Sequence, residues 1–365
     1  METNNLRALL ELGQSPWYDN IDRRLLEDGL MENLFASGIT GVTSNPSIFE
    51  KAVNGSSVYD SSIRELAEAG KTPDEICNLI TIQDIQSAAD MLRETYKATK
   101  GVDGYVSLEV NPDYAYDPDK TIEHAREIYR EVARPNLMIK VPGTTEGCEA
   151  IRVLTREGIN VNVTLLFSLK HYEKSAAAYM EGLKQRLRDA NPLDTVCSVA
   201  SVFVSRVDTK VDKTLEGLEK NHLRGKIAVA NVKMIYQRFK ELFFDGTFAG
   251  LASNGGRIQR VLWGSTSTKD PSYSDVKYVD ELIGRHTINT LPHNTLQAFL
   301  DHGDPRLTIE EDLDKAREDL DLLQQQGVNL DKICDQIQQE GVDAFIASFK
   351  KLMAAVAEKA RFSKL

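Results

Sequence analysis

NLMIKVPGTTEG, residues 136–147, is the stretch that decides the fold, because it places a lysine inside an apolar run of strand length. A Pro-Gly pair stops the run, and residues typical of a helix start follow it. Side chains alternate along a strand, so Leu137, Ile139 and Val141 share one face and Lys140 lies on the other. If helices cover the first face, Lys140 points into the opposite one.

A lysine in such a run has two interpretations, and this stretch alone leaves both open. Burying an ammonium without a partner costs several kcal/mol or forces its pKa down. The neutral amine is a nucleophile, which is what a Schiff-base enzyme needs from lysine. Alternatively, Lys140 lies at a strand end and extends its ammonium to water.

Composition describes an ordinary globular chain and limits its partners. The chain has 365 residues, of which 41% are hydrophobic and 27% charged, with a formal net charge of −11. This charge argues against a nucleic-acid binder or a binder of anionic membranes, so an anionic substrate needs a local basic cluster. The four cysteines are far apart, without metal-ligand spacing, and predict reduced thiols in the cytoplasm. The sequence shows no signal segment and no apolar run of about 18 residues, so secretion and membrane spanning have no support.

Strand and helix patterns alternate along the chain, and no hairpin signal interrupts them. Eight short strands are expected at 15–20, 39–46, 104–110, 137–142, 159–166, 197–204, 258–264 and 286–291. Helical segments are expected from the end of the second strand to about residue 70. Further helices are expected at 6–13, 22–37, 72–98, 117–133, 144–158, 168–190, 206–222, 225–245, 273–284 and 308–361.

This alternation predicts an α/β fold with a parallel sheet, and the count of eight predicts a single (β/α)8 TIM barrel. Such barrels take about 250 residues. The surplus falls in extra helices and in a helical C-terminal extension at 308–361. The sequence shows no linker or internal repeat, so residues 1–365 are expected to form one domain.

Polar residues interrupt the apolar pattern of three successive strands. They are Ser107 and Glu109, then Lys140, then Asn162 and Thr164, each on the face opposite its apolar neighbours. They could be satisfied polar groups of a core or a partly solvated face, but parallel strands normally carry near-continuous apolar runs. In a barrel they converge on one interior, near the strand ends that hold catalytic residues.

Asp19, at the end of the first strand, would share this pocket with Glu109 and Lys140. A desolvated lysine attacks a carbonyl, a carboxylate takes and returns protons, and amide or hydroxyl side chains fix hydroxyls and a water. An iminium serves as the electron sink, so this chemistry needs neither metal nor cofactor, and none is expected. The six histidines form no HExxH pattern.

A phosphate site is expected after the sixth and seventh strands, where barrels commonly bind this group. Arg206 follows the sixth strand, and the polar loop 265–269 follows the seventh. The alternative is a helix-capping serine beside a solvated arginine.

Several of these stretches together resemble the transaldolase family, Schiff-base-forming transferases of the pentose phosphate pathway. The resemblance covers nearly the whole chain. It rests on GVTSNPSIFEKA at 41–52, the lysine strand, GINVNVTLLFS at 158–168 and NTLP at 289–292.

The resemblance implies a role for each matching residue. Lys140 would form the Schiff base, Asp19 would deprotonate the C4 hydroxyl of the substrate, and Glu109 and Thr164 would hold a proton-shuttling water. The family's second phosphate arginine, after strand seven, does not align, and Thr266, Ser267 or Lys269 would take its place. The implied substrate-binding residues are Asn45, Thr43, Ser107, Asn162, Ser201, Phe203, Arg206, Thr266 and Lys269.

The implied reaction moves a dihydroxyacetone unit from sedoheptulose 7-phosphate to glyceraldehyde 3-phosphate, giving erythrose 4-phosphate and fructose 6-phosphate. The alternative is a fructose 6-phosphate aldolase that releases free dihydroxyacetone. In that related group a Gln replaces the water-holding Glu and a Tyr replaces a Phe, whereas this chain has Glu109 and Phe203. A third interpretation is a barrel that binds sugar phosphates as a sensor or scaffold. The oligomeric state, monomer or homo-oligomer, is left open.

Overall fold

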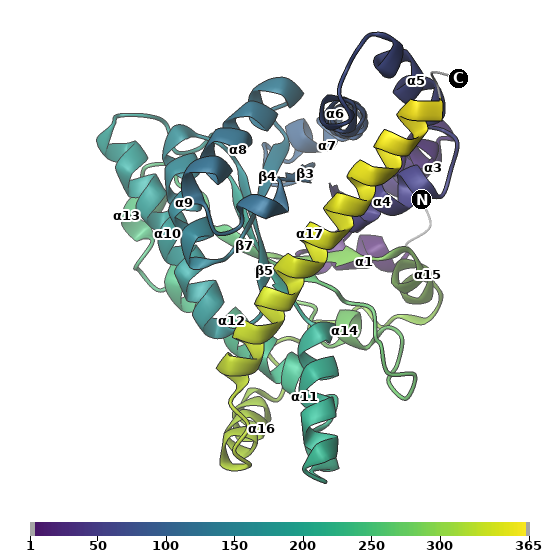
Figure 1. The fold of residues 1–365 in the computed structure, drawn as a ribbon. Helices are drawn as coiled ribbons and strands as arrows, with labels where there is room; N and C mark the ends of the chain where they lie inside the picture. The colour runs from purple at the N-terminus through teal and green to yellow at the C-terminus, as the bar shows by residue number, and fades with distance from the viewer. Residues whose placement is uncertain (1–3, 363–365) are drawn as a thin grey trace.

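Eight parallel strands close into a barrel in the computed structural model, which describes residues 4–362 (Figure 1). The strands follow one another around the barrel in chain order, and the first pairs with the eighth. The predicted (β/α)8 fold is therefore confirmed. The strands are β1 (Gln14–Tyr18), β2 (Gly41–Thr43), β3 (Val106–Glu109), β4 (Leu137–Pro142), β5 (Val161–Leu166), β6 (Ser198–Phe203), β7 (Gln259–Gly264) and β8 (Thr287–Leu291).

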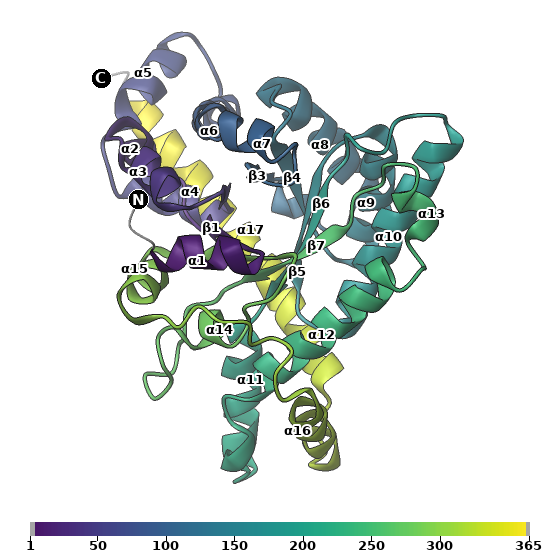
Figure 2. The same ribbon diagram turned by 180° about the vertical axis from the view of Figure 1, so that it is seen from behind.

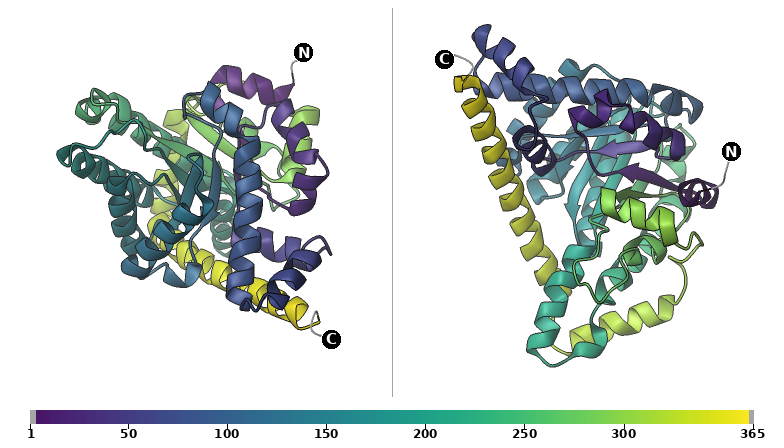
Figure 3. Two further views of the ribbon diagram at one scale, coloured as in Figure 1. Left: turned by 90° about the horizontal axis from the view of Figure 1, so that it is seen from above. Right: turned by 90° about the vertical axis from the view of Figure 1, so that its right-hand side faces the viewer.

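Helices surround the strands on all sides in Figures 2 and 3. No helix within residues 4–362 is long and apolar enough to cross a membrane. The helices are α1 (Asn5–Leu12), α2 (Arg23–Glu27), α3 (Leu30–Ser37), α4 (Pro46–Asn54), α5 (Asp60–Glu68), α6 (Pro73–Met91), α7 (Arg93–Ala98), α8 (Pro118–Val132), α9 (Thr145–Glu157), α10 (Leu169–Arg188), α11 (Ser205–Gly217), α12 (Ile227–Phe244), α13 (Ala249–Ala252), α14 (Lys277–Asp280), α15 (His293–His302), α16 (Leu313–Gln325) and α17 (Leu330–Phe362).

Several expected helices have different bounds: the one expected at 72–98 is divided into α6 and α7, and the one expected at 206–222 ends at Gly217. Three other differences have identifiable reasons. The helix expected at 22–37 is divided into α2 and α3 at Gly29, whose φ of 72° is left-handed. The expected helix at 273–284 is only α14, because the carbonyl of Ile283 accepts hydrogen bonds from the backbone of residues 308 and 309. The C-terminal extension begins at Leu313, and Gly327, with a φ of 80°, separates α16 from α17.

The amino-terminal half of the barrel interior is filled and sealed. Asp103 accepts a hydrogen bond from the Trp17 indole at 2.7 Å and another from the Ser15 hydroxyl. A Cβ at Gly41 would overlap the Trp17 ring, so only glycine fits there. An apolar layer above this base is formed by Trp17, Tyr105, Met138, Cys197, Val199, Leu262 and Ile288. Because the base is packed, the interior opens only at the carboxyl ends of the strands.

Helix α17 runs diagonally across the molecule and packs against these open ends (Figure 1). Gln338 donates hydrogen bonds to the carbonyl oxygens of Leu165, at 2.8 Å, and Gly143, at 3.2 Å. Leu165 has a φ of 58° within a break in the β5–β6 register. A Cβ at Gly341 would lie 2.9 Å from the Leu165 side chain, so a small residue lets the helix approach. The C-terminal extension is therefore part of the wall around the barrel mouth.

Candidate active site

The strand register brings the predicted polar residues together inside the barrel mouth. Glu109 of β3 pairs with Lys140 of β4, and Lys140 pairs with Asn162 of β5. Partners in adjacent parallel strands point to the same side of a sheet, here the interior. Asp19 follows β1 directly, and Ser201 lies in β6.

Lys140 is buried, which excludes the interpretation of an ammonium extended to water. Its side chain is 4% exposed. The amine Nζ donates a hydrogen bond to the backbone carbonyl of Ser44 at 3.0 Å and lies 3.8 Å from Oε2 of Glu109. The lysine therefore has one acceptor and one carboxylate beside it.

Glu109 has the properties of a proton-transfer group that works near neutral pH. Burial raises the pKa of its carboxyl to about 7, and the charge of Lys140 only partly opposes this shift. Neither carboxyl oxygen has a hydrogen-bond partner among residues 4–362, and the same holds for the buried hydroxyl of Thr164. An isolated buried carboxyl of this kind holds and releases a proton close to pH 7.

Asp19 is oriented by hydroxyl groups. Its Oδ1 accepts a hydrogen bond from the Thr43 hydroxyl at 2.7 Å, and that hydroxyl lies 2.7 Å from the hydroxyl of Thr290. Burial raises the pKa of Asp19, whereas Lys140, Thr43 and Arg206 lower it. Thr43, expected to bind substrate, thus contacts the second carboxylate of the site.

A row of hydrogen-bonded side chains crosses the interior. Ser201 donates to the amide oxygen of Asn162 at 2.6 Å, and the Asn162 amide nitrogen donates to the Ser107 hydroxyl at 2.9 Å. All three residues are buried. The row fixes which way the Asn162 amide faces.

A cavity of about 340 Å³ opens from this group of residues at the barrel mouth. Glu109, Asn162, Thr164 and Ser107 lie behind its lining. Thr266 is fully buried, donates to the carbonyl oxygen of Thr290 at 3.4 Å, and does not line the cavity. The predicted residues that line it are Asp19, Thr43, Asn45, Lys140, Ser201, Phe203, Arg206 and Lys269.

Two further lining residues, Lys51 and Phe345, were not expected from the sequence. Lys51 lies in α4, within the 41–52 motif. Helical spacing does not show that this side chain faces the pocket, so only the motif could have indicated it. Phe345 lies on α17, and its ring centre is 6.0 Å from Nζ of Lys140. No local pattern indicates that a helix so late in the chain reaches the barrel mouth.

Three cationic side chains, Lys51, Arg206 and Lys269, lie at the rim of the cavity. Burial lowers the pKa of Lys269, and the nearby charges of Arg206 and Lys51 lower it further. Within residues 4–362, none of the three forms an ion pair with a carboxylate. Lys269 donates a hydrogen bond to Ser267 at 2.6 Å, and the Arg206 guanidinium lies 5.3 Å from the Phe203 ring centre. A cluster of unpaired cations is suited to a multiply charged anion.

The pKa of Glu109 makes the stability of the fold pH-dependent. When folding raises the pKa of a carboxyl, its contribution to stability is fully present below the pKa that the group has in the unfolded chain. This contribution is lost as pH rises toward the folded pKa of about 7. We expect the free energy of unfolding of the wild type, relative to Glu109→Gln, to fall by about 3 kcal/mol between pH 4.5 and 7.5. Denaturant titration at several pH values measures this difference. Glu94→Gln, on an exposed side chain, is the control, and parallel curves for wild type and Glu109→Gln would contradict the assignment.

Comparison with known proteins agrees with this geometry. The model of the family described as Transaldolase/Fructose-6-phosphate aldolase matches residues 16–356. The chain is 42% identical to "Transaldolase" of Trichodesmium erythraeum, over 99% of both chains. It is 43% identical to "Transaldolase" of Saccharopolyspora erythraea, over 98% of this chain and 99% of the relative. It is 44% identical to "Transaldolase" of Thermobifida fusca, over 97% and 98%. The chain therefore belongs to the transaldolase/fructose-6-phosphate aldolase family and is an enzyme of the transaldolase type.

Proposed function

We propose that this enzyme transfers a three-carbon dihydroxyacetone unit from sedoheptulose 7-phosphate to glyceraldehyde 3-phosphate through a Schiff base on Lys140. The observation that carries the proposal is the buried amine 3.8 Å from Glu109, at the floor of a cavity whose wall includes Asp19 and whose rim is cationic. A lysine amine attacks carbonyls, and two carboxyls in different surroundings divide the proton transfers between them.

The first stage forms the iminium. The amine of Lys140 attacks the C2 carbonyl of the ketose, the oxygen leaves as water, and the proton it needs comes from Glu109 through a water molecule. Glu109 and Thr164 are suited to hold this water, because both present buried oxygens without another partner among residues 4–362. A carboxyl with a pKa near 7 can donate the proton and take it back.

The second stage breaks the C3–C4 bond. Asp19 takes the proton of the C4 hydroxyl, the C4–O electrons form an aldehyde, and the C3–C4 electron pair moves into the iminium to give a neutral enamine. Thr43 holds Oδ1 of Asp19 during this step. The reverse sequence joins the enamine to the second aldehyde, and Asp19 returns the proton.

The hydroxyls of the three-carbon unit would be bound by the row Ser107–Asn162–Ser201 and by Asn45, which lines the cavity. The phosphate would be bound by Arg206 and Lys269, with Ser267 beside Lys269. In this chain Lys269, helped by Lys51, would take the place of the family's second arginine. Arg206, Lys51, Ser267 and Lys269 all line the cavity, on the side of the barrel where phosphates commonly bind.

Transfer, rather than release of free dihydroxyacetone, is supported by Glu109 and Phe203 and by the relatives' names. The decisive assay incubates the enzyme with fructose 6-phosphate, with and without erythrose 4-phosphate. We expect a seven-carbon ketose phosphate, and glyceraldehyde 3-phosphate beyond one equivalent of enzyme, only when the acceptor is present. Release of dihydroxyacetone without an acceptor would indicate the aldolase, and no turnover in either mixture would refute an enzymatic role.

Covalent trapping tests the role of Lys140. With fructose 6-phosphate and borohydride, we expect one dihydroxyacetone-derived adduct on the peptide that contains Lys140, because reduction makes the iminium permanent. Peptide mass spectrometry locates it. Lys140→Met should lose both the adduct and turnover, whereas Asp19→Asn should still be trapped without cleaving the sugar. An adduct at another lysine would end the assignment.

Arg206→Ala tests the phosphate site. Loss of a charge-assisted contact to phosphate costs about 1.5–3 kcal/mol, so kcat/KM for fructose 6-phosphate should fall about tenfold to a hundredfold, mainly through KM. Transfer from unphosphorylated fructose should change little, and Lys213→Ala, on the same helix but outside the cavity lining, is the control. Equal losses on both sugars would remove Arg206 from the phosphate site.

A further inference from the structure

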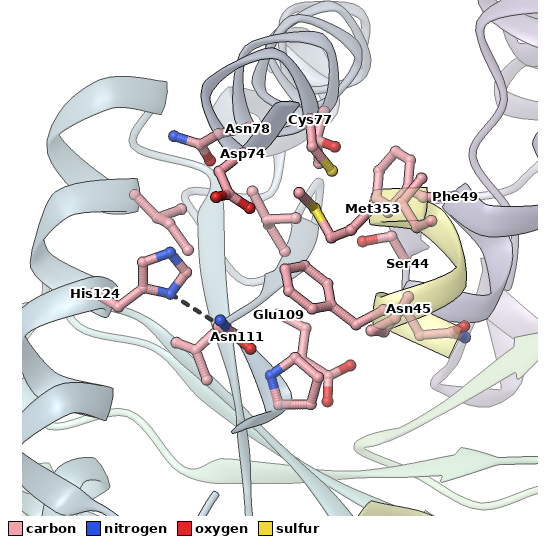
Figure 4. Close-up of a pocket in the computed structure, with 18 of the residues that line it drawn as sticks. Ser44, Asn45, Phe49, Asp74, Cys77, Asn78, Glu109, Asn111, His124 and Met353 are labelled. Atoms are coloured by element: carbon pink, nitrogen blue, oxygen red, sulfur yellow. Dashed lines mark hydrogen bonds between the residues drawn. The ribbon is translucent and has the colours of Figure 1, made fainter. Parts of the chain in front are cut away.

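A second cavity, of about 480 Å³, adjoins the active site and lies under α17 (Figure 4). We call it the α17 chamber. It lies between α4, α6, α8 and the end of β3, with Phe349, Leu352 and Met353 of α17 in its wall. Its volume is in the range of small-molecule sites. Asn45 lines both cavities.

The two cavities have opposite charge. The active-site cavity contains three rim cations in addition to Lys140. The described residues that line the α17 chamber include no Lys or Arg, but they include three carboxyls. Glu75 is paired with Lys71 at 2.9 Å and Glu109 lies beside Lys140, so the negative charge of the chamber comes from Asp74, which has no ion pair among residues 4–362. Burial lowers the pKa of His124, the chamber's histidine, so its ring is neutral at pH 7. The single unpaired carboxylate therefore favours a cation over a sugar phosphate in the chamber.

Polar groups at one end of the chamber are arranged for a specific partner. Nδ1 of His124 accepts the backbone N–H of Asn111 at 3.1 Å, so in the neutral ring Nε2 carries the proton and acts as a donor. The amide nitrogen of Asn78 donates to Glu131 at 2.9 Å, which leaves its oxygen as an acceptor. Asp74 lies near them with an exposed carboxylate (Figure 4). This end thus offers a donor, an acceptor and a negative charge.

The rest of the chamber is apolar. Its lining includes Phe49, Leu108, Ile128 and the three α17 residues. Cys77 adds to this surface, because burial and, secondarily, the charge of Asp74 raise the pKa of its thiol to about 12. A thiol that stays protonated behaves as a small apolar group and not as a nucleophile.

We propose that the α17 chamber binds a small amphipathic amino alcohol: an apolar body against α17, an ammonium at Asp74 and Asn78, and a hydroxyl oxygen at Nε2 of His124. Such a ligand contacts the Ser44–Pro46 segment, whose Ser44 carbonyl accepts the hydrogen bond from Lys140. The chamber therefore adjoins the proposed catalytic group, because Asn45 lines both cavities and Glu109 lines the chamber, whereas Lys140, Asp19 and the three rim cations line only the active-site cavity. This inference goes beyond the transfer reaction and does not depend on it.

Three probes of one shape test the charge: phenylalaninol, a cation; 3-phenyl-1-propanol, which lacks the ammonium; and phenyllactate, an anion. Titration calorimetry of the full chain should give phenylalaninol a dissociation constant of about 1 mM, as expected for a ligand of this size. The neutral alcohol should bind more weakly, and phenyllactate should not bind at the chamber. Crystals soaked in phenylalaninol should show it against Met353 and Asp74.

Matched variants test the location. Asp74→Asn should weaken phenylalaninol about fivefold and leave 3-phenyl-1-propanol unchanged, because an exposed charge contributes up to about this much. Asp119→Asn is the control: like Asp74, Asp119 follows the proline that begins its helix, but it lies outside the chamber. Met353→Trp should fill the chamber and abolish binding of both probes, whereas Lys351→Ala, exposed on the same helix, should not.

Any of the following results would overturn the proposal. One is the absence of phenylalaninol binding at 10 mM, about ten times the expected constant. Another is equal binding of phenyllactate, or equal effects of Asp74→Asn and Asp119→Asn. A further one is competition between phenylalaninol and fructose 6-phosphate, with the probe located in the active-site cavity. Because binding is measured without turnover, failure of the proposed transfer reaction would not produce any of these results.

Discussion

The burial of one amine beside a carboxyl, in a barrel whose other end is sealed, is the constraint on which this structure depends. Lys140 and Glu109 are both removed from water, and neither has a full set of hydrogen bonds to protein. Removing charges from water is unfavourable, so such a pair persists only where the surrounding packing is strong. The apolar layer that includes Trp17 and Met138, supported by the polar base at Asp103, supplies that packing. The packed amino-terminal half of the barrel thus offsets the cost of burying Lys140 and Glu109 at the carboxyl end.

Different titration behaviour of two carboxyls follows from their neighbours. Glu109 has only Lys140 to oppose the effect of burial, and its pKa reaches about 7. Burial also raises the pKa of Asp19, but Lys140, Thr43 and Arg206 all oppose that shift by stabilising its charge. One group is thus suited to hold a proton and the other to accept one, as separate acid and base steps require. The cationic rim contributes to this difference, since the charge of Arg206 lowers the pKa of Asp19.

Much of this arrangement could be predicted from the sequence, because strands impose a period of two on side-chain direction. The polar residues of β3, β4 and β5 lie inside as expected. Loops have no such period, so the sequence could not tell that Thr266 is buried away from the cavity whereas Ser267 and Lys269 line it. Local sequence patterns also do not predict contacts between segments that are far apart in the chain. The short α14 depends on hydrogen bonds from residues 308 and 309, and the cavity is lined by Phe345, which lies far along the chain from the strands. A single domain and a cytoplasmic location stay predictions.

The place of α17 in the chain order has a consequence for synthesis. All eight strands leave the ribosome before the helix that carries Gln338, Gly341 and Phe345. A nascent barrel can therefore close its base while its mouth has no cover and the carbonyl of the left-handed Leu165 lacks its Gln338 donor. Domains commonly fold as units during translation. In this chain the active-site cavity is completed only by the last tenth of the polypeptide, so a product cut short by early termination keeps Lys140 but not the enclosure around it.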